Sequence, residues 1–182
     1  MNDVQDSYRL VSSGFDAVVK AVTPDKWGAQ SPCEQWTARD VVAHVVEGHR
    51  GMIAEVRGGQ SEPLGADEDP RQAWENASRA IDEITGDPEA VAKEMDGPTG
   101  RMPVGQIIAQ FVNMDVLVHT WDLARTIGAD ESLDEDTVRR AYEALKPMDA
   151  MIRQPYVFGP KLEPPMGADV QTEFLYFLGR RA

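Results

Sequence analysis

The stretch Met114-Asp115-Val116-Leu117-Val118-His119-Thr120-Trp121-Asp122-Leu123-Ala124-Arg125 lies in a long run, Pro103 to Gly128, that has no internal proline. Apolar residues recur along this run with a spacing closer to the helical period than to the alternation of a strand. They are Val104, Ile107, Ile108, Phe111, Val112, Leu117, Val118 and Leu123. Proline opens the run and glycine closes it, which matches the usual start and stop signals of a helix. The run therefore predicts a long central helix.

Asp115 and His119 are four residues apart, so on a helix their side chains lie on one face, with Asp122 one turn further along. A carboxylate and an imidazole at this spacing can bind one metal ion from a single helix. The simpler alternative is that the two side chains bond each other or face water. The apolar residues all round the helix favour a pair that points inward, where a buried carboxylate needs compensation by a partner such as a metal.

Length and composition indicate one globular domain, residues 1–182, that buries a substantial core. The net charge of −13 argues against nucleic acid and against an anionic membrane surface as partners. The chain has one cysteine, which excludes an internal disulfide framework. It shows neither an amino-terminal signal stretch nor a run long enough to span a bilayer. We therefore expect a cytoplasmic protein.

Amphipathic patterns predict further helices and no convincing strand. The second helix starts at Thr37, a good N-cap, with Asp40 as a capping-box partner. Pro147 is expected to split a later helix. The other expected helices cover residues 3–22, 71–84, 133 to about 153 and 169–178, with one or two turns in 87–95, a turn-rich connector in 96–102 and an extended segment in 154–167. The pattern indicates an all-α four-helix bundle with a short additional C-terminal helix.

His44, on the second helix, shares a face with Val41, Val45 and Met52, which predicts an imidazole on a mostly apolar face. His49 lies roughly 140° away around the helix and is expected at the surface or rim. In a bundle, His44 can face Asp115 and His119. Three protein ligands and one open position are typical of a catalytic metal site. A core histidine bonded to a carbonyl or an acid is the alternative for His44.

Three other residues are candidates for chemistry around such a site. Glu47, one turn after His44, could serve as an acid–base or outer-sphere group, or simply face solvent. Asp122 is better placed to orient a ligand, or to bind Arg125, than to coordinate directly. Cys33 could be a nucleophile beside a histidine, although a packed thiol is the stronger interpretation. Phosphate-binding loops and nucleophile-elbow serines do not occur in the sequence.

Three segments together resemble the actinobacterial DinB-like, mycothiol-dependent maleylpyruvate isomerase-related group, and in particular its small metal-binding branch. They run from Ser31 to Thr37, from Asp40 to Val46 and from Asp115 to Ala124, and the tail segments Phe158-Gly159-Pro160 and Phe174 to Arg180 are similar too. The resemblance implies a DinB-like four-helix bundle that binds a divalent metal, zinc or nickel, through His44, Asp115 and His119. Asp115 stands where the isomerase has a glutamate, so the exact isomerase reaction does not transfer.

The resemblance also implies metal-dependent chemistry with a low-molecular-weight thiol, mycothiol. The expected function is that of a thiol S-transferase-like enzyme acting on a small electrophile. Three alternatives stay open: a non-catalytic metal- or ligand-binding bundle, a plain helical scaffold, and metal-dependent hydrolysis by bound water. The expected partners are a small-molecule thiol and an electrophilic substrate, and the many apolar helical positions are compatible with a homodimer.

Overall fold

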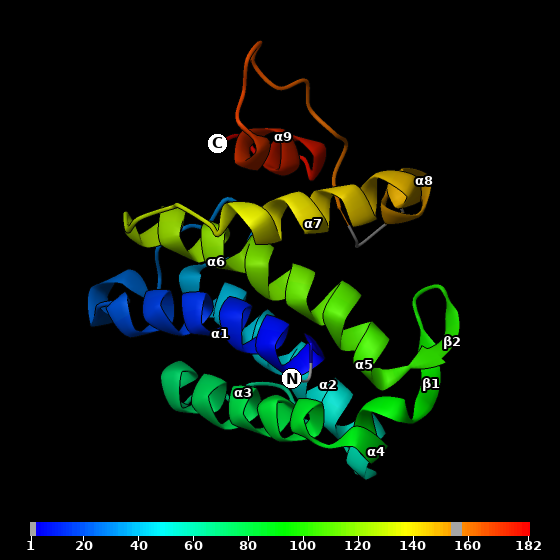
Figure 1. Ribbon diagram of the computed structural model, residues 1–182. Coiled ribbons are helices and arrows are strands. Elements are labelled where there is room, and N and C mark those ends of the chain that lie inside the picture. The colour runs from blue at the N-terminus through cyan, green and yellow to red at the C-terminus, as the bar shows by residue number, and fades with distance from the viewer. Residues whose placement is uncertain (1–2, 154–157) are drawn as a thin grey trace. The chain divides into compact units, whose positions relative to one another are not determined.

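A computed structural model describes residues 3–153 and 158–182 of the chain (Figure 1). The chain divides into two compact units, residues 1–131 and 132–182. The single domain expected from the sequence stays a prediction.

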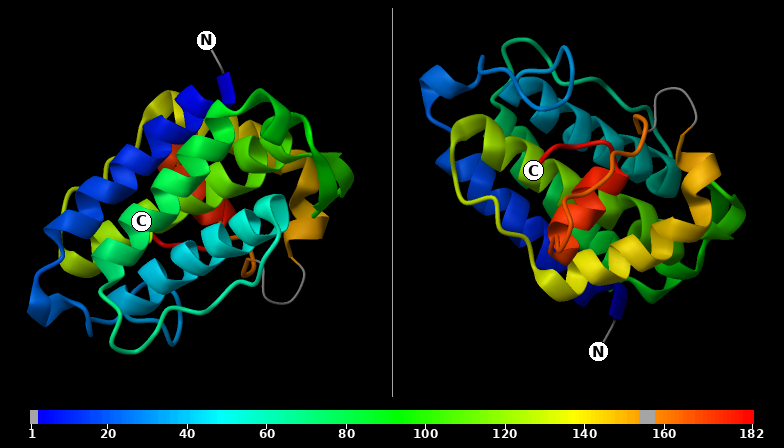
Figure 2. Two further views of the ribbon diagram at one scale, coloured as in Figure 1. Left: turned by 90° about the horizontal axis from the view of Figure 1, so that it is seen from below. Right: turned by 90° about the horizontal axis from the view of Figure 1, so that it is seen from above.

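Four helices build the first unit: α1 (Asp3–Ala21), α2 (Ala38–Arg57), α3 (Pro70–Gly86) and α6 (Asn113–Ile127). Helix α1 packs against α3 and α6, and α2 packs against the same two helices, which closes a bundle. Views from below and above show these helices running alongside one another (Figure 2). The all-α four-helix bundle predicted from the sequence is confirmed.

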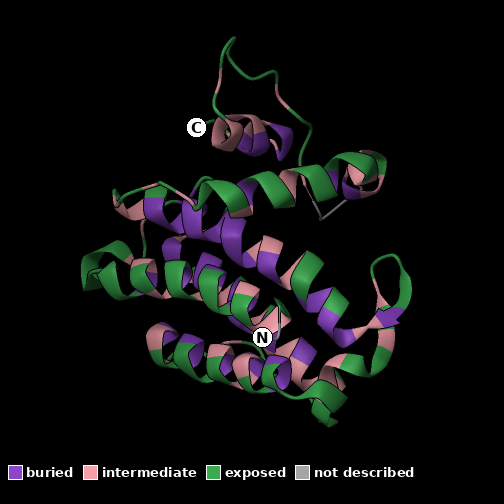
Figure 3. Ribbon diagram, in the orientation of Figure 1, coloured by how far each residue is buried: buried purple, intermediate pink, exposed green. Residues whose placement is uncertain are grey.

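The core of the first unit is made by the inward faces of these helices, while their outward faces are exposed (Figure 3). Phe15 of α1 meets the ring of Trp74 of α3 edge-on, with 4.7 Å between ring centroids. Val116 and Leu123 of α6 join the same buried cluster. This tightly packed apolar centre fixes how α6 lies against α2.

Helix α2 begins as the sequence predicts and exposes a different histidine from the one expected. Thr37 and Asp40 form a capping box. The expectation that His49 lies at the surface or rim is wrong, because His49 is buried. His44, expected on a mostly apolar face, is exposed. The buried face of α2 also includes Val42 and Val46, as well as Val41 and Val45. At 100° per residue its centre falls near His49, which leaves His44 at the edge.

The segment between α3 and α6 contains a β-hairpin that the sequence pattern did not indicate. After the short helix α4 (Pro88–Ala92), strand β1 (Glu94–Gly97) pairs antiparallel with β2 (Gly100–Pro103). The prediction of no strand is therefore wrong. The strands are only four residues long, too short and too polar for an alternating pattern to stand out.

The predicted central helix runs from Val104 to Ile127, and a π-helical segment divides its α-helical parts. It comprises α5 (Val104–Ile107), a π-helical segment η2 (Ile108–Val112) and α6. Gly128 ends it with a left-handed φ of 76°. A π-helical turn within an α-helix is frequent near functional sites, and this one ends three residues before Asp115.

The second unit contains α7 (Glu135–Leu145), the 3-10 turn η3 (Lys146–Met148), α8 (Asp149–Ile152) and α9 (Val170–Phe177). The predicted break at Pro147 is confirmed, since η3 separates α7 from α8. Helix α9 packs on α7 through Tyr142, whose ring centroid lies 5.4 Å from that of Phe177. Of the extended segment expected in 154–167, residues 154–157 lie outside the described residues.

Within the described ranges, 3–153 and 158–182, none of the helices has both the length and the apolar character that crossing a membrane requires.

The buried imidazole of His49 makes the stability of the fold sensitive to acid. Its Nδ1 lies 2.8 Å from the carbonyl oxygen of Val45, and its Nε2 lies 3.1 Å from the hydroxyl of Tyr8. Burial lowers the pKa of His49 to about 4. Unfolding restores a pKa of about 6.5, so the unfolded chain binds the extra proton first. The stabilisation is therefore present above about pH 6.5 and is lost as the pH falls towards 4.

We expect the free energy of unfolding of the wild-type protein to fall by about 3 kcal/mol between about pH 7 and pH 4 through His49 alone. Urea unfolding of the wild type and of His49→Gln at several pH values measures this. The variant lacks the titrating group, so the difference in the free energy of unfolding between the variant and the wild type must change between about pH 7 and pH 4. A constant difference between the two proteins would contradict the prediction.

Candidate metal centre

Three potential metal ligands converge where α2 packs against α6. His44 comes from α2, and Asp115 and His119 come from successive turns of α6. One carboxylate oxygen of Asp115, Oδ1, lies 3.3 Å from Nε2 of His44 and 3.4 Å from Nε2 of His119. The three ligand atoms all lie within 4.8 Å of one another. The structure thus brings together the three residues that the sequence singled out.

These distances suit a metal better than direct hydrogen bonds. A charged imidazole–carboxylate hydrogen bond is usually about 2.7–2.9 Å long, shorter than both contacts of Asp115. Ligand bonds of about 2.0–2.1 Å to a tetrahedral zinc place neighbouring donor atoms roughly 3.3–3.4 Å apart. Two imidazole nitrogens and one carboxylate oxygen are also donors that zinc and nickel accept. The donor set and its spacing therefore fit a divalent ion.

The opposite side of the His119 ring is held by Asp122. Nδ1 of His119 lies 2.9 Å from Oδ2 of Asp122, a carboxylate with no exposed surface. A carboxylate oxygen accepts, so this contact favours the proton on Nδ1. With a metal bound, Nε2 would then present its lone pair toward the ion, which is the tautomer that a metal-binding imidazole needs.

The charges around the three residues favour a cation between them. Burial, the largest single influence, lowers the pKa of His119, but the charge of Asp115 and hydrogen bonds to Asp115, Asp122 and Cys33 together raise that pKa well above its ordinary value. Burial would raise the pKa of Asp115, whereas His119 and His44 hold it well below its usual range. The same attraction that retains a proton beside Asp115 would stabilise a metal ion there.

The cluster is closed on one side and open on the other. The exposed fraction of the side chain is 7% for His119, 33% for Asp115 and 43% for His44. A small molecule can therefore approach the ligand atoms past His44, while His119 is fixed from behind.

Two aromatic contacts that were not expected from the sequence complete the surroundings of the site. The Trp36 ring lies 4.8 Å from the His44 ring and 5.8 Å from the His119 ring, measured between centroids. Trp36 directly precedes the N-cap Thr37 and follows Gln35, which has a left-handed φ of 66°. The position of a tryptophan just before the helix that carries His44 is the one sequence signal that could have indicated this contact.

Glu47 belongs to neither group of potential ligands found among the described residues. Its carboxylate accepts a hydrogen bond of 2.9 Å from the backbone N–H of Leu64. That bond ties α2 to the loop before α3. An acid–base role for Glu47 stays a prediction.

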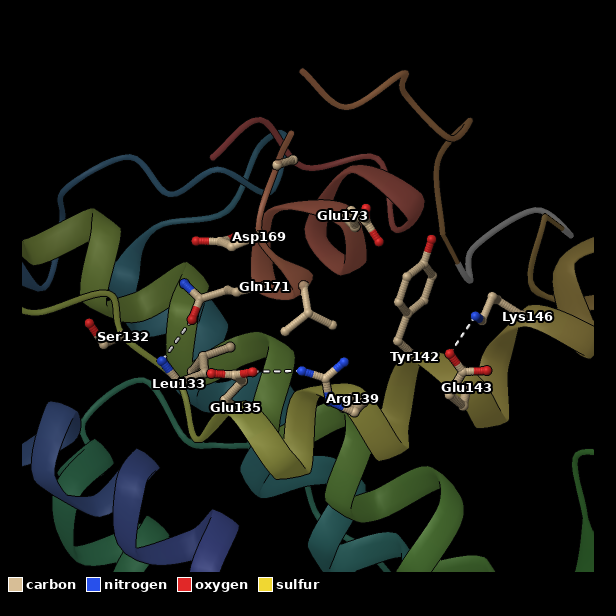
Figure 4. A pocket seen from close by; sticks show the side chains of 12 residues that line it. Ser132, Leu133, Glu135, Arg139, Tyr142, Glu143, Lys146, Asp169, Gln171 and Glu173 are labelled. Atoms are coloured by element: carbon tan, nitrogen blue, oxygen red, sulfur yellow. Dashed lines mark hydrogen bonds and ion pairs between the residues drawn. The ribbon is translucent and has the colours of Figure 1, made fainter. Parts of the chain in front are cut away.

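The second unit has a pocket of its own, with a volume of about 580 Å³ (Figure 4). Among its charged side chains, Glu135 pairs with Arg139 on α7, and Glu143 of α7 pairs with Lys146 of η3. The Tyr142 ring lies among them (Figure 4). Both potential metal-ligand groups in the described part of the chain are in the first unit, so this pocket is not the candidate centre.

Comparison with known proteins agrees with this architecture. Two uncharacterized proteins, from two strains of Mycobacterium tuberculosis, are each 28% identical over 130 residues, covering 71% of this chain and 70% of theirs. A crystal structure of a histidine-to-alanine mutant of the mycothiol-dependent maleylpyruvate isomerase superposes with a TM-score of 0.55 at 17% identity. That match covers 85% of this chain and 70% of the isomerase, and it shows the shared fold.

A family model also matches the first unit. The mycothiol maleylpyruvate isomerase N-terminal domain matches residues 8–124, from α1 to the end of the segment that bears Asp115, His119 and Asp122. This range is more than half of the chain and includes His44. The chain therefore belongs to the family of the mycothiol maleylpyruvate isomerase N-terminal domain.

Proposed function

We propose that His44, Asp115 and His119 bind one divalent metal ion, zinc or nickel, in an enzyme that transfers a low-molecular-weight thiol to a small electrophile. The observation that carries the proposal is the convergence of two imidazole nitrogens on one oxygen of Asp115, at 3.3 and 3.4 Å. Three protein donors and an opening toward solvent describe a centre that keeps a position for a small molecule.

The thiol is inferred from the relatives. The family and the isomerase whose fold this chain shares are both named for mycothiol. A divalent metal bound by the three residues would stabilise the thiolate form of a thiol at neutral pH, and the thiolate is the nucleophile. The proposed substrates are therefore mycothiol and an electrophilic carbon compound.

Three other features of the site would orient the ligands and admit the substrates. Asp122 holds Nδ1–H of His119 and keeps Nε2 directed at the other two ligands. Trp36 packs on both imidazole rings and limits their rotation. The exposed side of His44 leaves the approach for the thiol and the electrophile. In the transfer, the thiol would lose its proton to the surrounding water, the sulfur would form a bond to the electrophilic carbon, and the leaving group would depart with the electron pair of the broken bond.

A non-catalytic metal- or ligand-binding protein is the second candidate. The observation that favours it is that Glu47, the acid–base residue expected from the sequence, bonds to the backbone of Leu64. This alternative predicts bound metal and saturable thiol binding without turnover.

Metal analysis tests the ligand set. The wild-type protein should contain about one equivalent of zinc or nickel, and His44→Ala, Asp115→Ala and His119→Ala should each lose it, because two remaining donors bind too weakly. Elemental analysis of the four purified proteins measures this. His49→Gln is the matched control, since it alters the one other histidine of the chain and should retain the metal. A metal-free wild type after incubation with both ions would refute the proposed centre.

Asp122 should contribute to both stability and metal affinity. We expect Asp122→Ala to lower the free energy of unfolding of the metal-free protein by about 3 kcal/mol, because His119 loses its buried partner. Asp122→Asn should cost about 1–2 kcal/mol, since its amide oxygen can still accept from Nδ1–H. Zinc affinity should fall by roughly 10–100-fold in Asp122→Ala. Urea unfolding and chelator competition measure the two quantities, and unchanged zinc affinity would remove Asp122 from the centre.

Turnover separates the enzyme from the binding protein. The zinc-loaded wild type should accelerate the conjugation of mycothiol to chlorodinitrobenzene, in which the sulfur–carbon bond forms and chloride leaves. His119→Ala should react at the uncatalysed rate, whereas His49→Gln should match the wild type at a pH where both are folded. Absorbance of the conjugate gives the rate. Saturable mycothiol binding by calorimetry without any rate increase would favour the non-catalytic alternative.

A further inference from the structure

The loop before α2 contacts the candidate centre from behind. The thiol of Cys33 donates a hydrogen bond of 3.3 Å to Oδ2 of Asp122. The same oxygen accepts the 2.9 Å hydrogen bond from Nδ1 of His119. One buried carboxylate oxygen thus joins a thiol on the loop to an imidazole on α6, although Cys33 and Asp122 are 89 residues apart in sequence.

The chemistry of this contact assigns the thiol a role as donor. Asp122 has no exposed surface, so hydrogen bonds from protein groups must replace those from water. A thiol is a weak donor, and it donates only while it keeps its proton. A thiolate at this position would face the negative charge of Asp122 at 3.3 Å, which is repulsive. Cys33 is therefore better suited to holding Asp122 than to attacking a substrate.

The loop keeps the thiol in place through its own hydrogen bonds. The side-chain amide of Gln30 donates to the carbonyl oxygens of Ser31, Cys33 and Trp36. The backbone N–H of Ser31 donates to Trp36, and that of Trp36 donates to Cys33. Trp36 then packs on the His44 and His119 rings. The position of Cys33 is thereby fixed relative to both imidazoles.

We propose that Cys33 is a positioning residue of the metal centre. Its thiol fixes the Asp122 carboxylate, and the carboxylate fixes the His119 ring with Nε2 directed at Asp115 and His44. The proposal rests on the proposed function in that it takes these three residues as the ligands. The alternative is that Cys33 binds the metal directly. Cys33, His119 and Asp122 could form such a site, since their ligand atoms lie within 4.8 Å of one another.

Zinc affinity in two variants tests the positioning role. Cys33→Ala removes the donor and should weaken zinc binding by about tenfold, the lower end of the range for partners outside the ligand set. Cys33→Ser retains an O–H donor and should stay within about threefold of the wild type. Competition with a chromophoric chelator gives both constants. Equal affinities for the wild type and Cys33→Ala, or equal losses in both variants, would overturn the proposal.

Cobalt separates positioning from coordination. The cobalt-loaded wild type should show no thiolate-to-metal charge-transfer absorption in the near ultraviolet, because Cys33 lies outside the ligand set. Its visible ligand-field bands should shift in Cys33→Ala and return in Cys33→Ser. A near-ultraviolet band in the wild type that disappears in both variants would show that Cys33 binds the metal directly, which overturns the positioning role.

A measurement on the metal-free protein tests the role of Cys33 independently of the proposed function. In the metal-free protein, the proton resonance of His119 Nδ1–H should shift in Cys33→Ala and return toward the wild-type position in Cys33→Ser. If the wild type binds no metal, the proposed function fails while this resonance still decides whether Cys33 orders the imidazole. An identical resonance in the wild type and Cys33→Ala would overturn the proposal whatever the metal result.

Discussion

The polar centre of this bundle depends on one buried carboxylate. Asp122 has no exposed surface, and one of its oxygens accepts hydrogen bonds from His119 on its own helix and from Cys33 on a distant loop. Removing a carboxylate from water is costly unless donors surround it, so α6 and the loop before α2 must meet at this point. The direction of the His119 ring then follows from the bond to its Nδ1. The position of Asp115, one turn earlier, follows from the helix itself.

The apolar core and the polar centre constrain each other. Val116 and Leu123, which flank the polar residues of α6, lie in the cluster that also buries the valines of α2. Packing of these residues sets the distance between α2 and α6, and this distance decides whether His44 reaches Asp115. The 3.3 Å contact between the two side chains is thus a consequence of core packing as much as of local sequence. A cavity at Val116 would therefore change the distances between the ligand atoms.

Local patterns allowed much of this to be predicted. The spacing of Asp115, His119 and Asp122 on one helix, and the capping box at Thr37, are properties of short segments that periodicity reveals. The burial of His49 and the exposure of His44 could not be found that way, because they depend on which valines α2 buries against α3 and α6. The hydrogen bond from Cys33 to Asp122 is even harder to predict from local patterns. The two residues are 89 positions apart, and a single sequence carries no signal for such a pairing.

The charges of the proposed ligand set favour an anionic fourth ligand. Two neutral imidazoles and one carboxylate leave a divalent ion with a formal charge of about +1, unlike a site built from several thiolates. The chain as a whole carries a net charge of −13, which repels anions at long range. At ordinary ionic strength that repulsion is screened within about 10 Å, whereas the attraction at the open position acts over a bond length. Binding of an anionic ligand to such an ion would therefore be governed by the local charge, which stays positive because Asp115, the one anionic ligand, neutralises only one of the two charges of the ion.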